Sequence, residues 1–186
     1  MSDRLRTLMT APLFKEPGSE AERADERSYP KGILLAPMGL ADPDLRHQAE
    51  QYFIAAEAMV GLVLDNKVAD YTVPTPILFL YRHSFELYLK VLIQKQGRQP
   101  KRKHSLRELV EVSDGLPDWA TQRLYELDDI DLRSVMLRYG GVPGHLIEQW
   151  AELTFFRDAM RLLRDLFIVM VDGRQPHQWW LEHEDA

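Results

Sequence analysis

The segment from Pro76 to Ile93, "PILFLYRHSFELYLKVLI", limits most strongly what this chain can fold into. Its apolar residues recur around almost the whole circumference of a helix, and a helix that is hydrophobic all round is a buried one. It also carries Arg82, His83, Glu86 and Lys90. At about 100° per residue, these four side chains fall within roughly 100° of arc. The segment therefore predicts a mostly buried helix with one narrow polar side.

We call Arg82, His83, Glu86 and Lys90 the charged strip. Burying charge is costly unless it is paired, and the i,i+4 steps from Arg82 to Glu86 to Lys90 offer pairing. Two interpretations stay open at this point. In one, the strip faces solvent, as such strips usually do. In the other, it lines a groove in which Arg82 and Lys90 hold an anion, Glu86 orients them, and His83 or His104 titrates near neutral pH.

The buried helix is expected from Thr75-Pro76 to about Gln96, with Gly97 as its C-cap. Before it, "ADPD" predicts a long helix with Asp42 as N-cap and Pro43 in the first position, ending near residue 66.

After it, Ser105 and Glu108 form a capping box that opens a short helix. One or two further short helices are expected within 118–138, and a last long helix within 145–171. The predicted fold is all-α, an antiparallel helical bundle of three long helices plus two or three short ones. Residues 1–41 would form an irregular lead-in, 42–172 the bundle and 173–186 a tail.

Composition points to a cytoplasmic protein. The chain has no cysteine among its 186 residues, which fits a reducing compartment. Apolar runs such as Ile77 to Tyr81 are far short of the roughly 20 residues that cross a bilayer, so we expect no membrane contact. The net charge is −6, which argues against indiscriminate binding of nucleic acid. Within this average, segment 95–107 is basic and segment 108–131 is acidic, so a local basic site stays open.

Three motifs together resemble uncharacterised bacterial members of the HEPN superfamily. They are "LYRHSFELYLKVLI", then "KHSL" at the start of a short helix, and "DLRSVMLRYGG" before the last long helix. The resemblance covers residues 43–171. It implies a small HEPN-like helical bundle that acts in a toxin–antitoxin or phage-defence module and forms a homodimer in which two copies of the motif share one cleft.

Active members carry an Arg followed, after four to six residues, by a His. Arg138 and His145 match that spacing at its long end. The resemblance implies a metal-independent ribonuclease without a cofactor, in which His145 is the general acid/base and Arg138 stabilises the phosphorane charge. Tyr139 stands where a polar residue is expected, and "GGVPG" lengthens the connection.

A ribonuclease would receive RNA on the charged strip and the basic segment. The residues expected to bind RNA or another anion are Arg82, His83, Glu86, Lys90, Lys101, Arg102, Lys103 and His104. The other hypothesis is a non-catalytic HEPN-like module, in which the strip and the acidic segment contact a nucleotide or a partner protein from the same gene module. Sequence patterns leave both hypotheses open.

Overall fold

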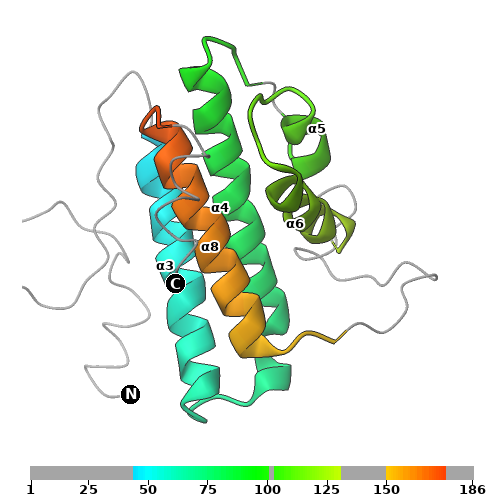
Figure 1. Cartoon of the computed structure of the whole chain (residues 1–186). Coiled ribbons are helices and arrows are strands. Elements are labelled where there is room, and N and C mark those ends of the chain that lie inside the picture. The colour runs from blue at the N-terminus through cyan, green and yellow to red at the C-terminus, as the bar shows by residue number, and fades with distance from the viewer. Residues whose placement is uncertain (1–43, 101–102, 131–149, 175–186) are drawn as a thin grey trace, which may run out of the picture. The chain divides into compact units, whose positions relative to one another are not determined.

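The computed structural model describes residues 44–100, 103–130 and 150–174 (Figure 1). Within these ranges the chain forms helices and no strand, so the predicted all-α class is confirmed. The elements are α3 (Leu45–Leu64), the 3-10 turn η1 (Asp70–Thr72), α4 (Pro74–Lys95), α5 (Leu106–Val110), α6 (Asp118–Asp129) and α8 (Leu153–Val171). None of these helices is long and apolar enough to cross a membrane.

Helix α4 is the predicted buried helix, and it contacts each of the other described α-helices. Helices α3 and α8 lie along one side of it, and α5 and α6 lie along another (Figure 1). Twelve of its 22 residues are buried, among them Tyr81, Phe85 and Tyr88 with no exposed surface. The aromatic rings continue into α8, where Phe167 packs 5.9 Å from Phe85 and 5.5 Å from Tyr88, centroid to centroid. The hydrophobic core of the described residues is therefore built around α4.

The long helices are not all antiparallel. Helix α3 runs against both α4 and α8, as predicted, but α4 and α8 run in the same direction (Figure 1). Ring contacts follow this direction, since Tyr81 meets Phe156 near the start of α8 and Tyr88 meets Phe167 near its end. Helix α8 therefore begins at the same end of the described helices as α4 does (Figure 1).

Two predicted helix starts were wrong. Asp44, not Asp42, is the N-cap of α3, because its side chain accepts a hydrogen bond from the backbone N–H of His47 at 3.1 Å. Helix α8 begins at Leu153 rather than near residue 145, because the Glu152 carboxylate accepts from the backbone N–H groups of Thr154 and Phe155 and so caps the helix there.

The other predicted caps are confirmed. Ser105 caps α5, with its hydroxyl accepting from the backbone N–H of Glu108 at 3.2 Å. Gly97 follows the end of α4 with a positive φ of 74°, and the N–H groups of Gly97 and Arg98 return to the carbonyls of Gln94 and Ile93. This is a Schellman motif, whose left-handed residue is usually glycine.

Two hydrogen-bonded triads join α3, α4 and α8. In the first, the Tyr81 hydroxyl donates to Glu57 at 2.6 Å, and Arg161 Nη2 contacts the other oxygen of that carboxylate at 2.6 Å. Burial, reinforced by the Glu57 carboxylate, raises the pKa of Tyr81 well above its usual range. The hydroxyl therefore keeps the proton that it donates.

The second triad repeats the first one two turns along. The Tyr88 hydroxyl donates to one oxygen of Glu50, and Arg164 donates to the other through Nε at 3.0 Å and Nη2 at 2.7 Å. Burial and Glu50 likewise raise the pKa of Tyr88. In each triad the glutamate accepts a hydrogen bond from a tyrosine hydroxyl. Without it, the packing of the three helices would leave this hydroxyl without a partner.

We expect Glu50→Ala to lower the free energy of unfolding by about 2–3 kcal/mol, because it leaves a buried tyrosine hydroxyl and a partly buried guanidinium without their acceptor. Urea unfolding followed by circular dichroism measures the change. The matched control is Glu126→Ala, which removes an exposed helical glutamate paired with Arg123 and should cost at most about 1 kcal/mol. Equal losses in the two variants would show that the Glu50 triad does not hold the helices together.

Candidate functional site

The buried carboxylate of Glu86 gathers four basic side chains around it. Its Oε1 accepts from Lys90 Nζ at 2.7 Å and lies 2.9 Å from Nδ1 of His104. Its Oε2 is 3.7 Å from both Arg82 Nη1 and His83 Nδ1. We call these five residues the Glu86 cluster. Four come from α4, and His104 comes from the segment that precedes α5.

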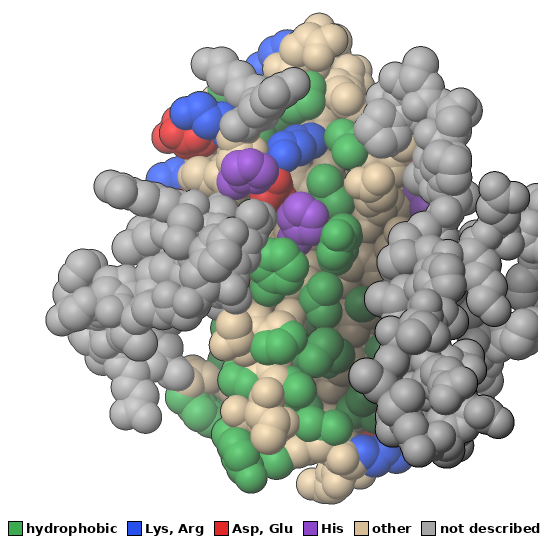
Figure 2. Space-filling view, turned by 180° about the vertical axis from the view of Figure 1, so that it is seen from behind, with side chains coloured by type: hydrophobic (Ala, Val, Ile, Leu, Met, Phe, Trp, Pro, Cys, Tyr) green, Lys and Arg blue, Asp and Glu red, His purple; other side chains and the backbone are tan. Residues whose placement is uncertain are grey.

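Burial divides the cluster into an inner and an outer part. Glu86 has an exposed fraction of 0% and Arg82 of 2%, so the interpretation in which the charged strip simply faces solvent is wrong for these two. The side chains of Lys90 and His83 are 16% and 21% exposed, and that of His104 is 54% exposed. On this face of the molecule, histidine side chains lie at the surface beside acidic and basic ones (Figure 2). The cluster therefore reaches solvent chiefly through His104.

The charge of Glu86 persists down to low pH. Burial by itself would raise the pKa of this carboxyl, but its interactions with His83, Lys90 and His104 outweigh burial and hold the pKa at about 2. The carboxylate is thus ionised throughout the physiological range. A charged acceptor of this kind fixes the donors that point at it.

Arg82 links the cluster to α5 and α6 through Asp128. Its Nη2 donates to the backbone carbonyl of His104 at 2.7 Å and to Asp128 Oδ1 at 2.9 Å. Asp128 also accepts from the Ser105 hydroxyl at 2.7 Å and from the backbone N–H of Leu106 at 2.8 Å. One aspartate thus holds Arg82 and the first turn of α5 together. The position of His104 follows, since its carbonyl and its ring are each bound by α4.

Three described cations of the basic segment pair with acids of the acidic segment that follows it. Lys103 pairs with Glu108 at 3.0 Å, and Arg107 pairs with Asp129 at 2.9 Å while its guanidinium lies over the Tyr125 ring. Arg98 likewise pairs with Asp114. These pairs are exposed or half-exposed, so each contributes at most about 1 kcal/mol and can be exchanged for another anion.

The structure brings together Arg82, His83, Glu86, Lys90 and His104, and it places Lys103 next to them in the chain. The other predicted site residues, Lys101, Arg102, Arg138 and His145, lie outside the described residues. Asp128 was not recognised as part of the site from sequence. It sits in an acidic segment with seven other acids, and no local pattern distinguishes it from them.

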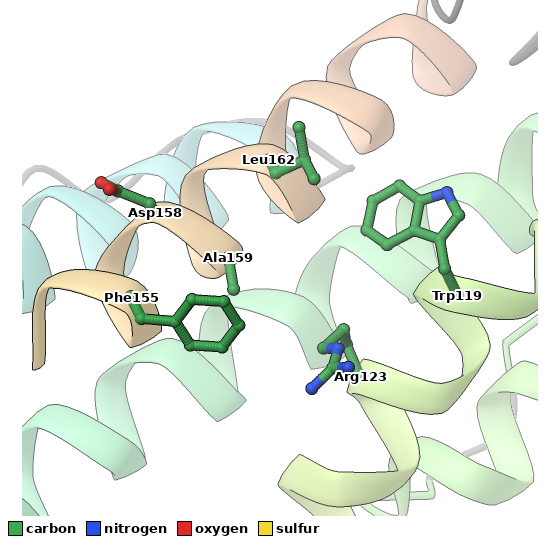
Figure 3. A pocket seen from close by; sticks show the side chains of 6 residues that line it. All are labelled: Trp119, Arg123, Phe155, Asp158, Ala159 and Leu162. Carbon is green, nitrogen blue, oxygen red and sulfur yellow. The ribbon is translucent and has the colours of Figure 1, made fainter. Parts of the chain in front are cut away.

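A groove of about 360 Å³ lies apart from the cluster, between α6 and α8 (Figure 3). Trp119 and Arg123 line it from α6, and Phe155, Asp158, Ala159 and Leu162 line it from α8. The Phe155 ring points toward Arg123, whereas the Asp158 carboxylate points away (Figure 3). Phe155 is 67% exposed. The groove therefore exposes an apolar side chain to solvent, whereas the exposed part of the Glu86 cluster is polar.

No family model, curated protein or solved structure matches the chain. The HEPN resemblance therefore rests on the three quoted motifs and stays a prediction. Among the residues that the structure describes, no three or more His, Cys, Asp or Glu side chains are grouped so as to hold a metal ion.

The low pKa of Glu86 makes the stability of the fold depend on pH. The folded-state pKa of about 2 lies below the ordinary value of 4.5, so ionised Glu86 stabilises the fold above pH 4.5, and this contribution is lost as pH falls toward 2. Glu86→Gln should lower the free energy of unfolding at pH 7 by about 3 kcal/mol.

The difference between wild type and Glu86→Gln should shrink below pH 4.5 and vanish near pH 2. Chemical unfolding at a series of pH values measures it. A difference that stays constant across this range would mean that the charge of Glu86 does not stabilise the fold.

Proposed function

We propose that the chain is a HEPN-like domain that binds RNA or a nucleotide at the Glu86 cluster. The observation that carries this proposal is the convergence of Arg82, His83, Lys90 and His104 on one carboxylate, with His104 half-exposed. The first three of these residues lie on α4, and His104 lies 14 residues after Lys90. The interpretation of the charged strip as an anion site had already joined them. A group of basic side chains whose positions are set by a buried charge is pre-organised for an anion.

Phosphate would compete for cations that are already paired at the surface. Lys103, next to His104, pairs with Glu108 on the exposed side of α5. Such a pair is weak, and a phosphate group can replace its carboxylate with little loss. The Arg82–Glu86 and Arg82–Asp128 pairs are buried and would stay in place as the floor of the site. Binding of this kind depends on salt.

The resemblance extends the proposal to cleavage. It assigns the chemistry to Arg138 and His145 and implies a metal-independent ribonuclease that acts as a homodimer in a defence or toxin–antitoxin module. The lack of cysteine supports a place in the cytoplasm. The support for these finer assignments is the spacing of the two residues in the sequence.

A second candidate function is a non-catalytic module that binds a partner protein. The groove between α6 and α8 favours it, because its rim carries the exposed apolar side chains of Phe155 and Leu162. Exposed apolar surface rimmed by polar groups is typical of protein-interaction sites. In that case the Glu86 cluster would only hold α4, α5 and α6 together.

A mixed-sequence single-stranded RNA oligonucleotide and a mononucleotide are the probes for binding, measured by fluorescence anisotropy at several salt concentrations. Lys103→Ala should weaken RNA binding and lower the slope of log K against log[salt] by about 1, as expected for one lost phosphate contact. The control is Lys67→Ala, an exposed lysine in the turn after α3 that pairs with Asp65. If wild type binds neither probe, the proposed function is wrong.

Cleavage of the same oligonucleotide in the presence of a chelator tests the pair implied by the resemblance. We expect His145→Ala to lower the cleavage rate by about 10²–10⁴-fold, the usual contribution of one general acid or base. RNA binding and the unfolding midpoint should stay close to those of wild type. Undiminished cleavage by this variant would remove His145 from the site.

A further inference from the structure

His104 has the surroundings of a catalytic imidazole rather than of a purely structural one. Its Nδ1 lies 2.9 Å from Glu86 Oε1, and its side chain is 54% exposed. Because the Glu86 carboxylate is ionised, it can only accept a hydrogen bond, so the contact requires the ring proton on Nδ1. In the neutral imidazole the second nitrogen, Nε2, is then the basic one.

Contacts of its backbone, of the next residue and of its ring hold His104 in this position. Arg82 Nη2 donates to its backbone carbonyl at 2.7 Å. The next residue, Ser105, caps α5 and donates to Asp128, which in turn binds Arg82. The carboxylate that orients the ring belongs to α4, whose Glu86 is fully buried. Both the backbone and the ring of His104 are therefore fixed from the core.

We propose that His104 and Glu86 form an acid/base dyad, in which His104 Nε2 takes the proton of a ribose 2′-hydroxyl and Glu86 is the positioning residue. This inference rests on the proposed function, since it names the proton acceptor for RNA bound at the same site. A carboxylate that holds an imidazole in one tautomer and stabilises the imidazolium is a general device of acid/base catalysis.

The step is balanced as an intramolecular transfer. The 2′ oxygen gives its proton to His104 Nε2 and bonds to the adjacent phosphorus, while the bond from phosphorus to the 5′ oxygen breaks. The leaving 5′ oxygen takes a proton from water. The products are a 2′,3′-cyclic phosphate and a 5′-hydroxyl, and the His104 imidazolium returns its proton to the solvent.

Lys90 adds a positive charge beside the dyad. Its Nζ is 2.7 Å from the same Glu86 oxygen that faces His104, so the ammonium and the imidazole are neighbours. The phosphorane gains negative charge as the 2′ oxygen attacks, and a cation already in place stabilises it without further reorganisation. A ribose hydroxyl next to a phosphate is thus the substrate group that the dyad and Lys90 fit together.

The tautomer of His104 tests the dyad without any variant. In ¹⁵N-labelled wild type at a pH where the ring is neutral, the ring-nitrogen shifts should show the proton on Nδ1. His47, an exposed histidine on α3 whose Nε2 lies 3.0 Å from the side-chain nitrogen of Gln51, gives the shifts of a ring held by a neutral partner. A His104 ring with its proton on Nε2 would overturn the dyad, whatever the protein binds.

Cleavage of the RNA oligonucleotide tests the catalytic role. His104→Gln should lower kcat by about 10²–10⁴-fold, a much larger factor than any change in KM, while the control His47→Gln should cleave at the wild-type rate. Glu86→Gln, assayed where it is still folded, should lower kcat by a larger factor than it raises KM and should weaken the preference for the Nδ1 tautomer. The product should carry a 2′,3′-cyclic phosphate, and RNA with a 2′-deoxy sugar at the cut position should resist cleavage.

The outcomes separate the inference from the proposed function. If wild type binds neither probe, both fall. If it binds RNA and cleaves it, and His104→Gln cleaves at the wild-type rate, the dyad alone falls. If it binds RNA without cleaving it, the dyad falls as a catalyst and the binding function stands.

Discussion

Helix α4 is buried on nearly every side, and its buried polar side chains are bonded to neighbouring segments or to one another. Toward α3 and α8 the groups are Tyr81 and Tyr88, which donate to glutamates of α3 that arginines of α8 also bind. Toward α5 and α6 they are Arg82 and Glu86. A buried polar group without a partner costs about 1–3 kcal/mol and a buried charge more. These partners therefore determine which surface of each neighbour faces α4.

The same requirement explains why α5 and α6 carry the surroundings of the site. Asp128 meets the charge of Arg82, and the remaining lone pairs of Asp128 accept from Ser105 and Leu106 at the start of α5. His104 immediately precedes that helix. Its backbone is therefore fixed by the hydrogen bonds that Arg82 makes with its carbonyl and with Asp128. The backbone and the ring of His104 are both hydrogen-bonded before any ligand binds. Its side chain therefore loses little further conformational entropy on binding.

The helices could be predicted from sequence because their patterns are local. The apolar circumference of α4, the serine cap of α5 and the glycine after α4 each concern residues within one or two turns. The direction of α8 against α4 and the start of α8 could not be predicted in this way. The first depends on contacts between residues far apart in sequence, such as Tyr81 with Phe156. The second depends on Glu152, a capping residue outside the set that usually occupies this position.

The site shows the same division between local and distant contacts. The i,i+4 pair of Glu86 with Lys90 follows from helical spacing and is present at 2.7 Å. The strongest contacts of Arg82 run instead to His104 and Asp128, 22 and 46 residues away, which no periodic pattern reports. The two triads correspond to a spacing pattern in the sequence. Tyr81 and Tyr88 are seven residues apart, and so are Glu50 and Glu57, which places each pair on one face of its helix.

Glu86 is more than Arg82 requires. Asp128 already gives Arg82 a carboxylate at 2.9 Å, whereas Glu86 lies 3.7 Å from it and places its shorter contacts on Lys90 and His104. Replacing Glu86 alone would leave Lys90 without its carboxylate, and removing one partner of a buried pair is strongly destabilising, so Glu86 has a structural role. Its carboxylate also orients a lysine and a half-exposed imidazole. That orientation is the observation on which the proposed dyad of Glu86 and His104 rests.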